Sequence, residues 1–312
     1  DDTYTADRLI KDVLVGSKCD LVSNVKYQYC DGSPGSTAIY PLGYFQRNGA
    51  DFPFEDGIVI STDQASFVPG PFPGRSSANN NTWRWAGDQD LNDLINDSGG
   101  WPIRGGQPVT DMRSASIDFE FIPMQNTVTF EYLFGSSSYN GPGCWGDCTN
   151  ASQFGAWLID MTTGVGQNLA IVPNTNQPVS IATVRDGNKT YPNDCAAGGP
   201  LSVNEQYFGN AYGNAANQIA PIAAPVNLFG HTTAMQSLSA NVIVGRRYRI
   251  KLAIVDFCNT GSHTSAVFFK SGSFDIGDLD LGAPQLIGNG EGLCVGDSYT
   301  LKSGLDPLLF TF

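Results

Sequence analysis

Acidic and amide side chains at alternate positions are the first feature with a recognisable chemistry. Asp88, Asp90 and Asn92 place oxygen ligands at every second residue, as a calcium loop does. The Gly and the Glu that complete an EF-hand loop are absent from the corresponding positions, 93 and 99. Asp88 as the N-cap of a helix, with Asp90 in the first turn, explains the same residues without a metal. The sequence leaves both interpretations open.

Three further carboxylates raise the question of acid–base catalysis. Asp118 and Glu120 share one face of a predicted strand, and Glu131 lies on the next one. Carboxylates about 5 to 10 Å apart suit glycoside hydrolysis, but acidic side chains on a solvated sheet face are commoner. His231 and His263 are candidate bases, yet the chain has no Gly-x-Ser-x-Gly turn and no His-Glu-x-x-His motif. We therefore predict no catalytic residues and no enzymatic activity.

Tryptophans in Gly- and Asn-rich segments indicate binding instead. Trp145 and Asp147 lie between two closely spaced cysteines, and Trp83 and Trp85 follow an Asn-rich run. An aromatic ring on a loop can stack on the apolar face of a sugar while Asn and Asp side chains bond its hydroxyls. These four residues are the predicted ligand-binding site. The alternative is that the tryptophans cover the ends of the fold.

The composition argues against two classes of partner. There are 17 Lys and Arg against 30 Asp and Glu, so the net charge is −13. Nucleic acids and anionic lipids both require clustered cations. The most apolar stretch, residues 219–229, is shorter than the roughly 20 residues of a membrane helix and contains two prolines. We expect neither nucleic-acid binding nor direct membrane insertion.

The cysteines and the loop-rich composition indicate an oxidising, extracellular compartment. Six of the seven cysteines are predicted to form disulfides, although the sequence does not fix the connectivity: Cys19 with Cys30, Cys144 with Cys148, and Cys195 with Cys258. Cys294 either pairs with a cysteine beyond the chain or is a free buried thiol. The first residues do not look like a signal peptide, so we expect an exported chain whose signal has been removed.

The elements that position these residues are predicted to be mostly strands. Short helices are expected at residues 5–16 and 88–97, and alternating apolar residues predict strands at 116–122, 127–134, 154–159, 179–184, 238–244, 247–255 and 265–269. Long Gly- and Pro-rich connections favour an all-β, jelly-roll-like two-sheet sandwich. Ala283-Pro284 marks the boundary between a domain of residues 1–283 and an incomplete β module of residues 284–312.

Several short motifs lie in order along residues 5–275 and together are specific. They are Gly43-Tyr44-Phe45, Phe52–Thr62, Gly87–Leu91, Asp118–Pro123, Phe130–Ser136, Phe154–Leu158, Asn168–Pro173, Phe229–Thr233, Tyr248–Asp256 and Ser265–Phe274. This set resembles the choice-of-anchor L domain family.

The resemblance implies a secreted or surface-anchored protein of Gram-negative gliding bacteria, similar to large gliding-motility adhesins of the SprB type. Such proteins carry this domain at the N-terminus, continue in Ig-like repeats and end in a type IX secretion signal. Residues 290–312 resemble the start of such a repeat. The implied location is the outer surface of the cell, attached to the outer membrane. The implied partners are downstream Ig-like domains and further surface subunits.

Two departures from the family pattern concern carboxylates. Ser136–Tyr139 stands where the family often has Ser-Glu-Glu-Tyr, and Thr264–Phe268 stands where it often has Asp-Ser-Ala-Val-Phe. Three carboxylates are therefore missing from two loops that the family pattern places near each other. If the family binds calcium there, we expect this chain to have lost that site.

Three functions follow from this interpretation. The favoured one is a non-enzymatic adhesion domain at the distal end of a surface filament, binding polysaccharide or another surface during gliding motility. The second is a structural cap that closes the end of the Ig-like array and binds no specific ligand. The third is a secreted glycan-acting enzyme. We expect no cofactor other than calcium at Asp88, Asp90 and Asn92.

Overall fold

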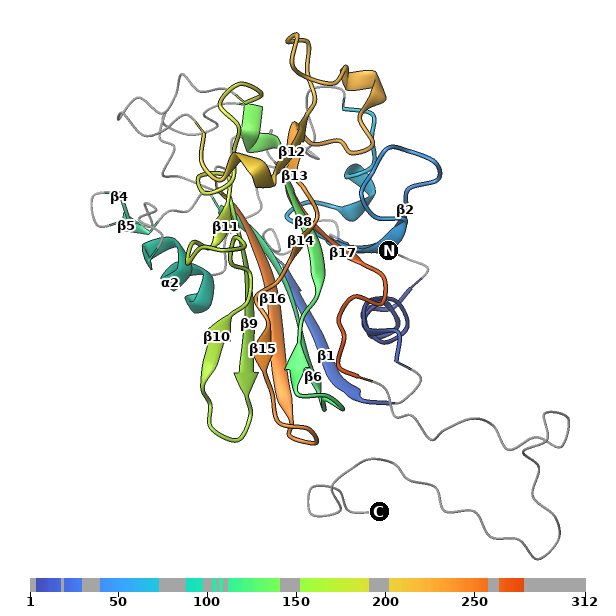
Figure 1. The fold of residues 1–312 in the computed structure, drawn as a ribbon, viewed down its shortest axis with the longest axis vertical. Coiled ribbons are helices and arrows are strands. Elements are labelled where there is room, and N and C mark those ends of the chain that lie inside the picture. The colour runs from blue at the N-terminus through green and yellow to red at the C-terminus, as the bar shows by residue number, and fades with distance from the viewer. Residues whose placement is uncertain are drawn as a thin grey trace, which may run out of the picture.

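Antiparallel strands in two facing sheets form the body of the described chain (Figure 1). The computed structural model describes residues 4–17, 20–29, 40–72, 88–97, 103–104, 107–108, 112–140, 152–190, 202–257 and 264–277. The predicted all-β, two-sheet sandwich is confirmed. The predicted module of residues 284–312 lies outside the described residues.

The first sheet presents one apolar face to the interior of the sandwich. Its strands, in spatial order, are β1 (Val22–Tyr29), β6 (Met112–Phe121), β16 (Tyr248–Phe257), β9 (Gln153–Asp160) and β10 (Gly166–Asn168), with β11 (Val179–Ser180) also paired to β9. Ile117 lies opposite Leu252, which lies opposite Ala156, and all three are buried. As the alternation predicted, Arg249 and Lys251 are on the opposite face of β16.

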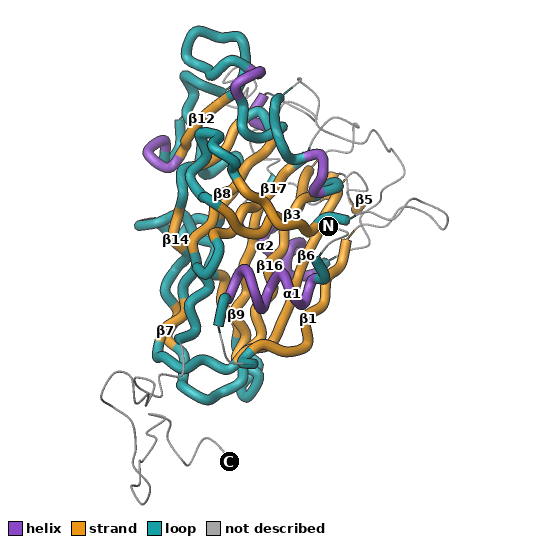
Figure 2. Tube along the Cα trace, turned by 90° about the vertical axis from the view of Figure 1, so that its right-hand side faces the viewer, coloured by secondary structure: helices purple, strands orange, loops and turns teal. Residues whose placement is uncertain are grey.

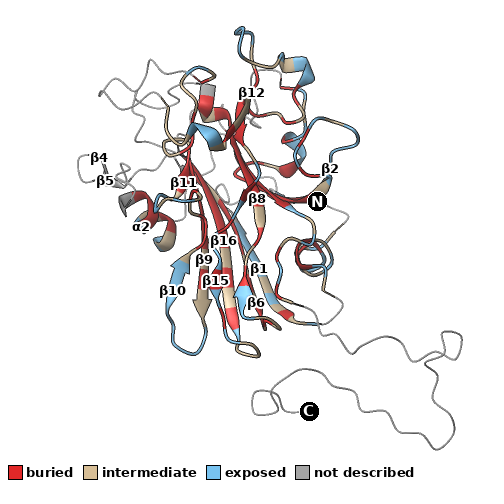
Figure 3. Ribbon diagram, viewed as in Figure 1, coloured by how far each residue is buried: buried red, intermediate tan, exposed pale blue. Residues whose placement is uncertain are grey.

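The second sheet is buried on both faces in its central strands (Figure 3). Its order is β12 (Phe208–Ala211), β13 (Gly230–Thr232), β8 (Glu131–Ser136), β17 (Ser265–Lys270), β3 (Asp56–Ser61) and β2 (Leu42–Gln46), with β14 (Met235–Gln236) also on β8. Phe268 and Phe269 point to opposite faces, yet both are buried. Loops therefore cover the outer face of this sheet with a second apolar layer.

Two short ladders and several single helical turns complete the described elements. The ladders are β7 (Thr127–Val128) with β15 (Ala240–Asn241), and β4 (Ile103–Arg104) with β5 (Gln107–Pro108). The turns are η2 (Ala65–Phe67), η3 (Ser137–Asn140), η4 (Glu205–Tyr207) and η5 (Pro221–Ala223).

Both predicted helices are present, on opposite flanks of the sandwich. The first, α1 (Ala6–Arg8), continues into the π-helical η1 (Leu9–Val15) and packs against β1 and β3 (Figure 2). Thr5 caps it by accepting a hydrogen bond from the Arg8 amide at 3.3 Å, and Gly16 ends it at φ 64°. The second, α2 (Gln89–Asp97), lies on the outer face of the first sheet.

Three predicted strands are shorter than expected, and in two of them a side-chain hydroxyl bonds the backbone in place of a neighbouring strand. In 179–184 only β11 forms, since Thr183 Oγ1 donates to the Pro178 carbonyl at 2.6 Å and turns the chain. In 127–134 the chain divides into β7 and β8, since the Phe130 amide donates to Ser237 Oγ at 3.0 Å. Within residues 238–244, only β15 forms a strand.

Candidate functional site

A cleft of about 610 Å³ opens on the outer face of the second sheet, beside its edge strand β2. We call it the β2 cleft. Its floor is the sheet itself with the loop of residues 47–55, and its far wall is the segment of residues 64–69 together with residues 225–226. The volume falls within the range of small-molecule sites, roughly 300–1,000 Å³.

The floor of the β2 cleft is an aromatic cluster. Phe268 packs edge to face against Phe45 and Phe52, with ring centroids 5.4 and 4.9 Å apart. Gly43 and Val59, opposite each other on β2 and β3, extend the same surface. A Cβ on Gly43 would lie 3.1 Å from the Ala65 side chain, so glycine here keeps the floor open beneath the wall.

The wall of the cleft is held by backbone hydrogen bonds between two loops. The Gly70 amide donates to the Pro225 carbonyl at 3.0 Å, and the Asn227 amide donates to the Val68 carbonyl at 2.7 Å. A side chain on Gly70 would collide with the Ala224 carbonyl. These bonds join protein groups to each other and hold the wall in place, and a wall held in this way lowers the entropic cost of binding.

The mouth of the cleft carries tyrosines and amides. Tyr40 is 52% exposed. Tyr44 also borders the cleft, but its ring packs against Tyr4, with centroids 5.8 Å apart, and its hydroxyl donates to Asp56 Oδ2 at 3.1 Å. Burial, followed by the hydrogen bond to Asp56, raises the pKa of Tyr44. The other polar lining side chains, Arg47 excepted, are uncharged: Gln46, Asn48, Gln64 and Ser66.

A tight turn presents Asn48 at one end of the cleft. Asn48 and Gly49 have φ values of 48° and 83°, and the Ala50 amide donates to the Arg47 carbonyl at 2.8 Å. This is a type I′ turn, for which Asn-Gly is the preferred pair. The Asn-Gly pair thus explains where β2 ends and why the amide of Asn48 lies at the opening.

A buried histidine supports the floor from below. The ring of His231 packs edge-on against Phe52, with centroids 5.8 Å apart. Its Nδ1 lies 2.7 Å from the Thr232 carbonyl and its Nε2 lies 2.7 Å from the Tyr212 hydroxyl. A carbonyl only accepts, so Nδ1 carries the proton and Nε2 accepts from Tyr212. Burial lowers the pKa of His231 to about 4, so this candidate base is a neutral structural residue near pH 7.

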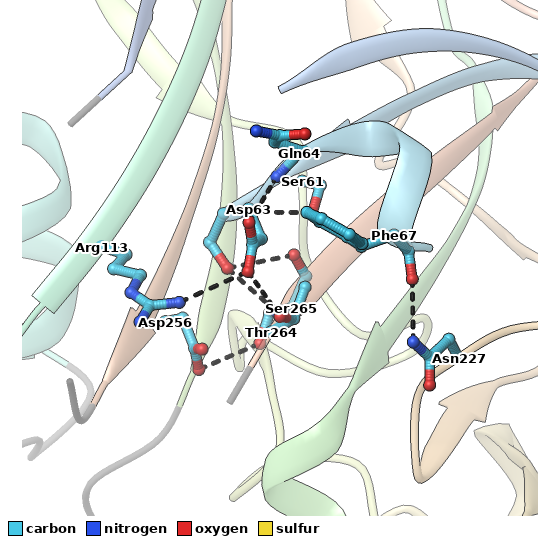
Figure 4. A network of polar contacts seen from close by, with 10 residues as sticks. Ser61, Asp63, Gln64, Phe67, Arg113, Asn227, Asp256, Thr264 and Ser265 are labelled. Atoms are coloured by element: carbon cyan, nitrogen blue, oxygen red, sulfur yellow. Dashed lines mark hydrogen bonds and ion pairs between the residues drawn. The ribbon is translucent and has the colours of Figure 1, made fainter. Parts of the chain in front are cut away.

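A second polar group of residues lies buried where several strands end, and we call it the strand-end cluster. It consists of Asp63, Arg113, Ser136, Ser138, Ser152, Asp256, Thr264 and Ser265. Arg113 Nη1 lies 3.6 Å from Asp63 Oδ2, and the side chains of both residues are at most 2% exposed (Figure 4). The Ser265 hydroxyl lies 3.2 Å from Asp256 Oδ1 and 2.9 Å from the Ser136 hydroxyl. Ser152 also donates to Asp256.

The cluster joins the two loops in which the chain departs from the family pattern. The Ser137 amide donates to the Thr264 carbonyl at 2.9 Å, so these loops are adjacent, as expected. Hydroxyls occupy the positions of the missing carboxylates, and the Arg113 guanidinium supplies the positive charge beside Asp63. Among the described residues no group of three or more His, Cys, Asp and Glu side chains could hold a metal ion.

Asp88 and Asp90 contact a lysine at the start of α2. Lys251 Nζ lies 2.6 Å from Asp88 Oδ2 and 2.8 Å from Asp90 Oδ2, and it lies 5.5 Å from the centre of the Trp157 ring. Asp88 Oδ1 also accepts from the Leu91 amide at 3.1 Å, which is the predicted helix cap. Calcium at Asp88, Asp90 and Asn92 stays a prediction, and it would have to displace this ammonium group.

The carboxylates considered for catalysis are not grouped. Asp118 and Glu120 lie on β6 in the first sheet, whereas Glu131 lies on β8 in the second and pairs with Lys270 at 2.8 Å. Glu120 pairs with Arg247 at 3.0 Å. Hydrogen bonds from Asn24 and Arg247 lower the pKa of Glu120, whereas burial raises that of Asp118. Glu131 lies on a later strand of the chain, as expected, but β6 and β8 belong to different sheets, so the three carboxylates do not share one sheet face.

The remaining predicted site residues lie outside the described residues. These are the ligand-binding candidates Trp83, Trp85, Trp145 and Asp147, the second histidine His263, and all the cysteines: Cys19, Cys30, Cys144, Cys148, Cys195, Cys258 and Cys294. The sequence argument missed the β2 cleft, although Gly43-Tyr44-Phe45 and Phe52 stood among the family motifs. The Asn48-Gly49 turn was the local signal that could have pointed to it.

A comparison with models of protein families matches residues 1–275 to the choice-of-anchor L domain. The chain belongs to this family. The resemblance seen in the motifs is thus confirmed, and the family description points to a cell-surface protein. A search of curated proteins found no match, and neither did a search of solved structures. Within the described residues of this choice-of-anchor L domain, no helix is both long enough and apolar enough to span a bilayer.

Proposed function

We propose that this choice-of-anchor L domain is a non-enzymatic recognition domain of a cell-surface protein, and that it binds saccharide in the β2 cleft. One observation carries the proposal: a preformed cleft combines a half-exposed tyrosine, an aromatic floor and uncharged amides. Sugars present apolar ring faces and many hydroxyls. The aromatic rings of the lining can stack on the ring faces, and its amides can hydrogen-bond the hydroxyls.

The contrast between the two polar regions favours binding over catalysis. The carboxylates of the strand-end cluster, Asp63 and Asp256, are at most 1% exposed, and their oxygens bond neighbouring side chains. The β2 cleft is open, but its lining within the described chain contains no carboxylate, histidine or cysteine. Glycoside hydrolysis needs two carboxyl groups at an accessible sugar site.

We propose a biological context for this binding: the domain lies at the head of an Ig-like filament, is exported by type IX secretion and mediates adhesion during gliding. A domain that only caps the Ig-like array would not need a ligand-binding cleft. Saccharide binding therefore distinguishes a recognition domain from a structural cap.

A glycan array followed by calorimetry tests the proposal. We expect Tyr40→Ala to weaken saccharide binding about tenfold, since a stacked ring contributes roughly 1 kcal/mol beyond its buried area. Tyr27→Ala is the matched control, because Tyr27 is 50% exposed but lies on β1 in the first sheet. Trp145→Ala tests the site first predicted from the sequence. Absence of binding to every glycan, or loss with Tyr27→Ala equal to that with Tyr40→Ala, would refute the cleft assignment.

A further inference from the structure

The charge of the β2 cleft differs from that of the whole chain. Asp and Glu account for 30 of the 312 residues and the net charge is −13. Among the described residues that line the cleft, none is acidic and Arg47 is the one charged side chain. The lining therefore lacks the acidic side chains that dominate the chain, although Glu55 and Asp56 contact two of its residues from outside. Its one cation, Arg47, offers a binding point for an anionic group on the ligand.

Arg47 is held in a fixed orientation at the cleft. Its Nη2 lies 2.6 Å from Glu55 Oε2, and its Nη1 donates to the Phe52 carbonyl at 3.4 Å. Its backbone amide donates to the Glu55 carbonyl at 2.9 Å, which anchors the residue at the end of β2. A guanidinium has five N–H donors, so these two side-chain contacts leave donors to meet a ligand.

The ion pair with Glu55 leaves Arg47 able to bind another anion. The side chains of Arg47 and Glu55 are 39% and 63% exposed, and exposed pairs are worth only about 0–1 kcal/mol. A ligand carboxylate can therefore share or replace Glu55 on the planar fork of the guanidinium, which matches a carboxylate in two parallel hydrogen bonds. A densely charged polyanion would instead be repelled by the acidic surface.

We infer that the ligand of the β2 cleft is a carboxylated saccharide, a uronic-acid-type sugar whose carboxylate is bound by Arg47 while its ring stacks on Tyr40. This inference rests on the proposed function and adds the chemical class of the ligand. It requires the acid form of a sugar to bind more tightly than an otherwise identical neutral form.

The test compares a panel of uronate tetrasaccharides with their fully methyl-esterified forms, in which a neutral ester replaces each carboxylate, by calorimetry on the whole chain. We expect at least one acid to bind about tenfold more tightly than its ester. In Arg47→Gln the preference should vanish while ester binding changes less than about twofold. The preference should also shrink in 1 M NaCl, where the Debye length is about 3 Å.

Arg246→Gln is the matched control, since Arg246 is 33% exposed and pairs with Asp160 at 2.9 Å, away from the cleft lining. Equal affinities for acid and ester across the panel would overturn the inference, and so would an equal loss of affinity for both in Arg47→Gln. Either result would leave the proposal of saccharide binding in place. If sulfated analogues bind more tightly than the uronates, the anionic group of the ligand is not a carboxylate. If no saccharide binds at all, both this inference and the proposed function are refuted.

Discussion

The strand-end cluster and the β2 cleft hold similar numbers of polar side chains but use them in opposite ways. In the cluster, carboxylates, hydroxyls and Arg113 bond one another and are buried. In the cleft, amides and Tyr40 surround an opening above an apolar floor. By residue type the cluster looks more like an active centre, yet its two carboxylates are buried and bond neighbouring side chains. Accessibility, rather than the kind of side chain, therefore identifies the candidate site.

The largest expected effect is on the cluster. Arg113→Met should lower the free energy of unfolding by about 3–5 kcal/mol, because it leaves the buried Asp63 carboxylate without its cation. Urea unfolding measures this cost. The double variant Asp63→Asn with Arg113→Met should recover part of the loss, and Arg246→Met, at an ion pair whose side chains are 33% and 16% exposed, should cost about 1 kcal/mol. An equal cost for Arg113→Met and Arg246→Met would contradict the interpretation of the cluster as internally bonded.

The next effect concerns the support of the cleft floor. His231 has a pKa of about 4 when folded, below its ordinary value of 6.5. The unfolded chain therefore binds the proton first, and the stability contributed by neutral His231 is complete above pH 6.5 and is lost as the pH falls towards 4. The loss amounts to about 3 kcal/mol.

The difference in unfolding free energy between pH 7 and pH 4.5 checks this for wild type against His231→Gln, whose side chain cannot titrate. We expect a shallower pH dependence in the variant. Identical slopes for the two proteins would show that His231 is not the group responsible.

The smallest effect is expected at α2. Lys251→Gln should destabilise the domain by about 1–2 kcal/mol, because it leaves Asp88, which is 13% exposed, beside Asp90 without a cation. Calcium should then raise the melting temperature of the variant, while a chelator leaves that of the wild type unchanged. A drop in the wild-type melting temperature on chelation would instead support calcium at Asp88, Asp90 and Asn92.

Alternation along the strands was enough to predict the sandwich. The inward positions of β16, from Tyr248 to Ile254, and the helix from Thr5 to Gly16 follow directly from periodicity and capping. Periodicity failed where Thr183 and Ser237 hydroxyls take over backbone hydrogen bonds, because such local bonds leave no repeating pattern.

The β2 cleft could not be predicted in the same way. Its wall depends on hydrogen bonds between residues 65–72 and 220–227, which are far apart in the chain and have no regular pattern. Its floor residues Phe45, Phe52 and Phe268 read as ordinary core residues, since nothing in the sequence says that one face of the second sheet is covered by loops. Adjacency of the loops at Ser136 and Thr264 was predictable, but only through the family pattern.

Phe52 and Phe268, the floor of the cleft, belong to the same contiguous apolar cluster that holds the two sheets together. An occupant of the cleft would rest directly on that cluster and be lost when the cluster comes apart. Ligand release and global unfolding are then linked by mass action, so a saturating saccharide at a hundred times its Kd should add about 2.7 kcal/mol to the folded state. A simple thermal-shift screen could consequently find the natural ligand, and a bound cell surface would make the domain harder to pull apart.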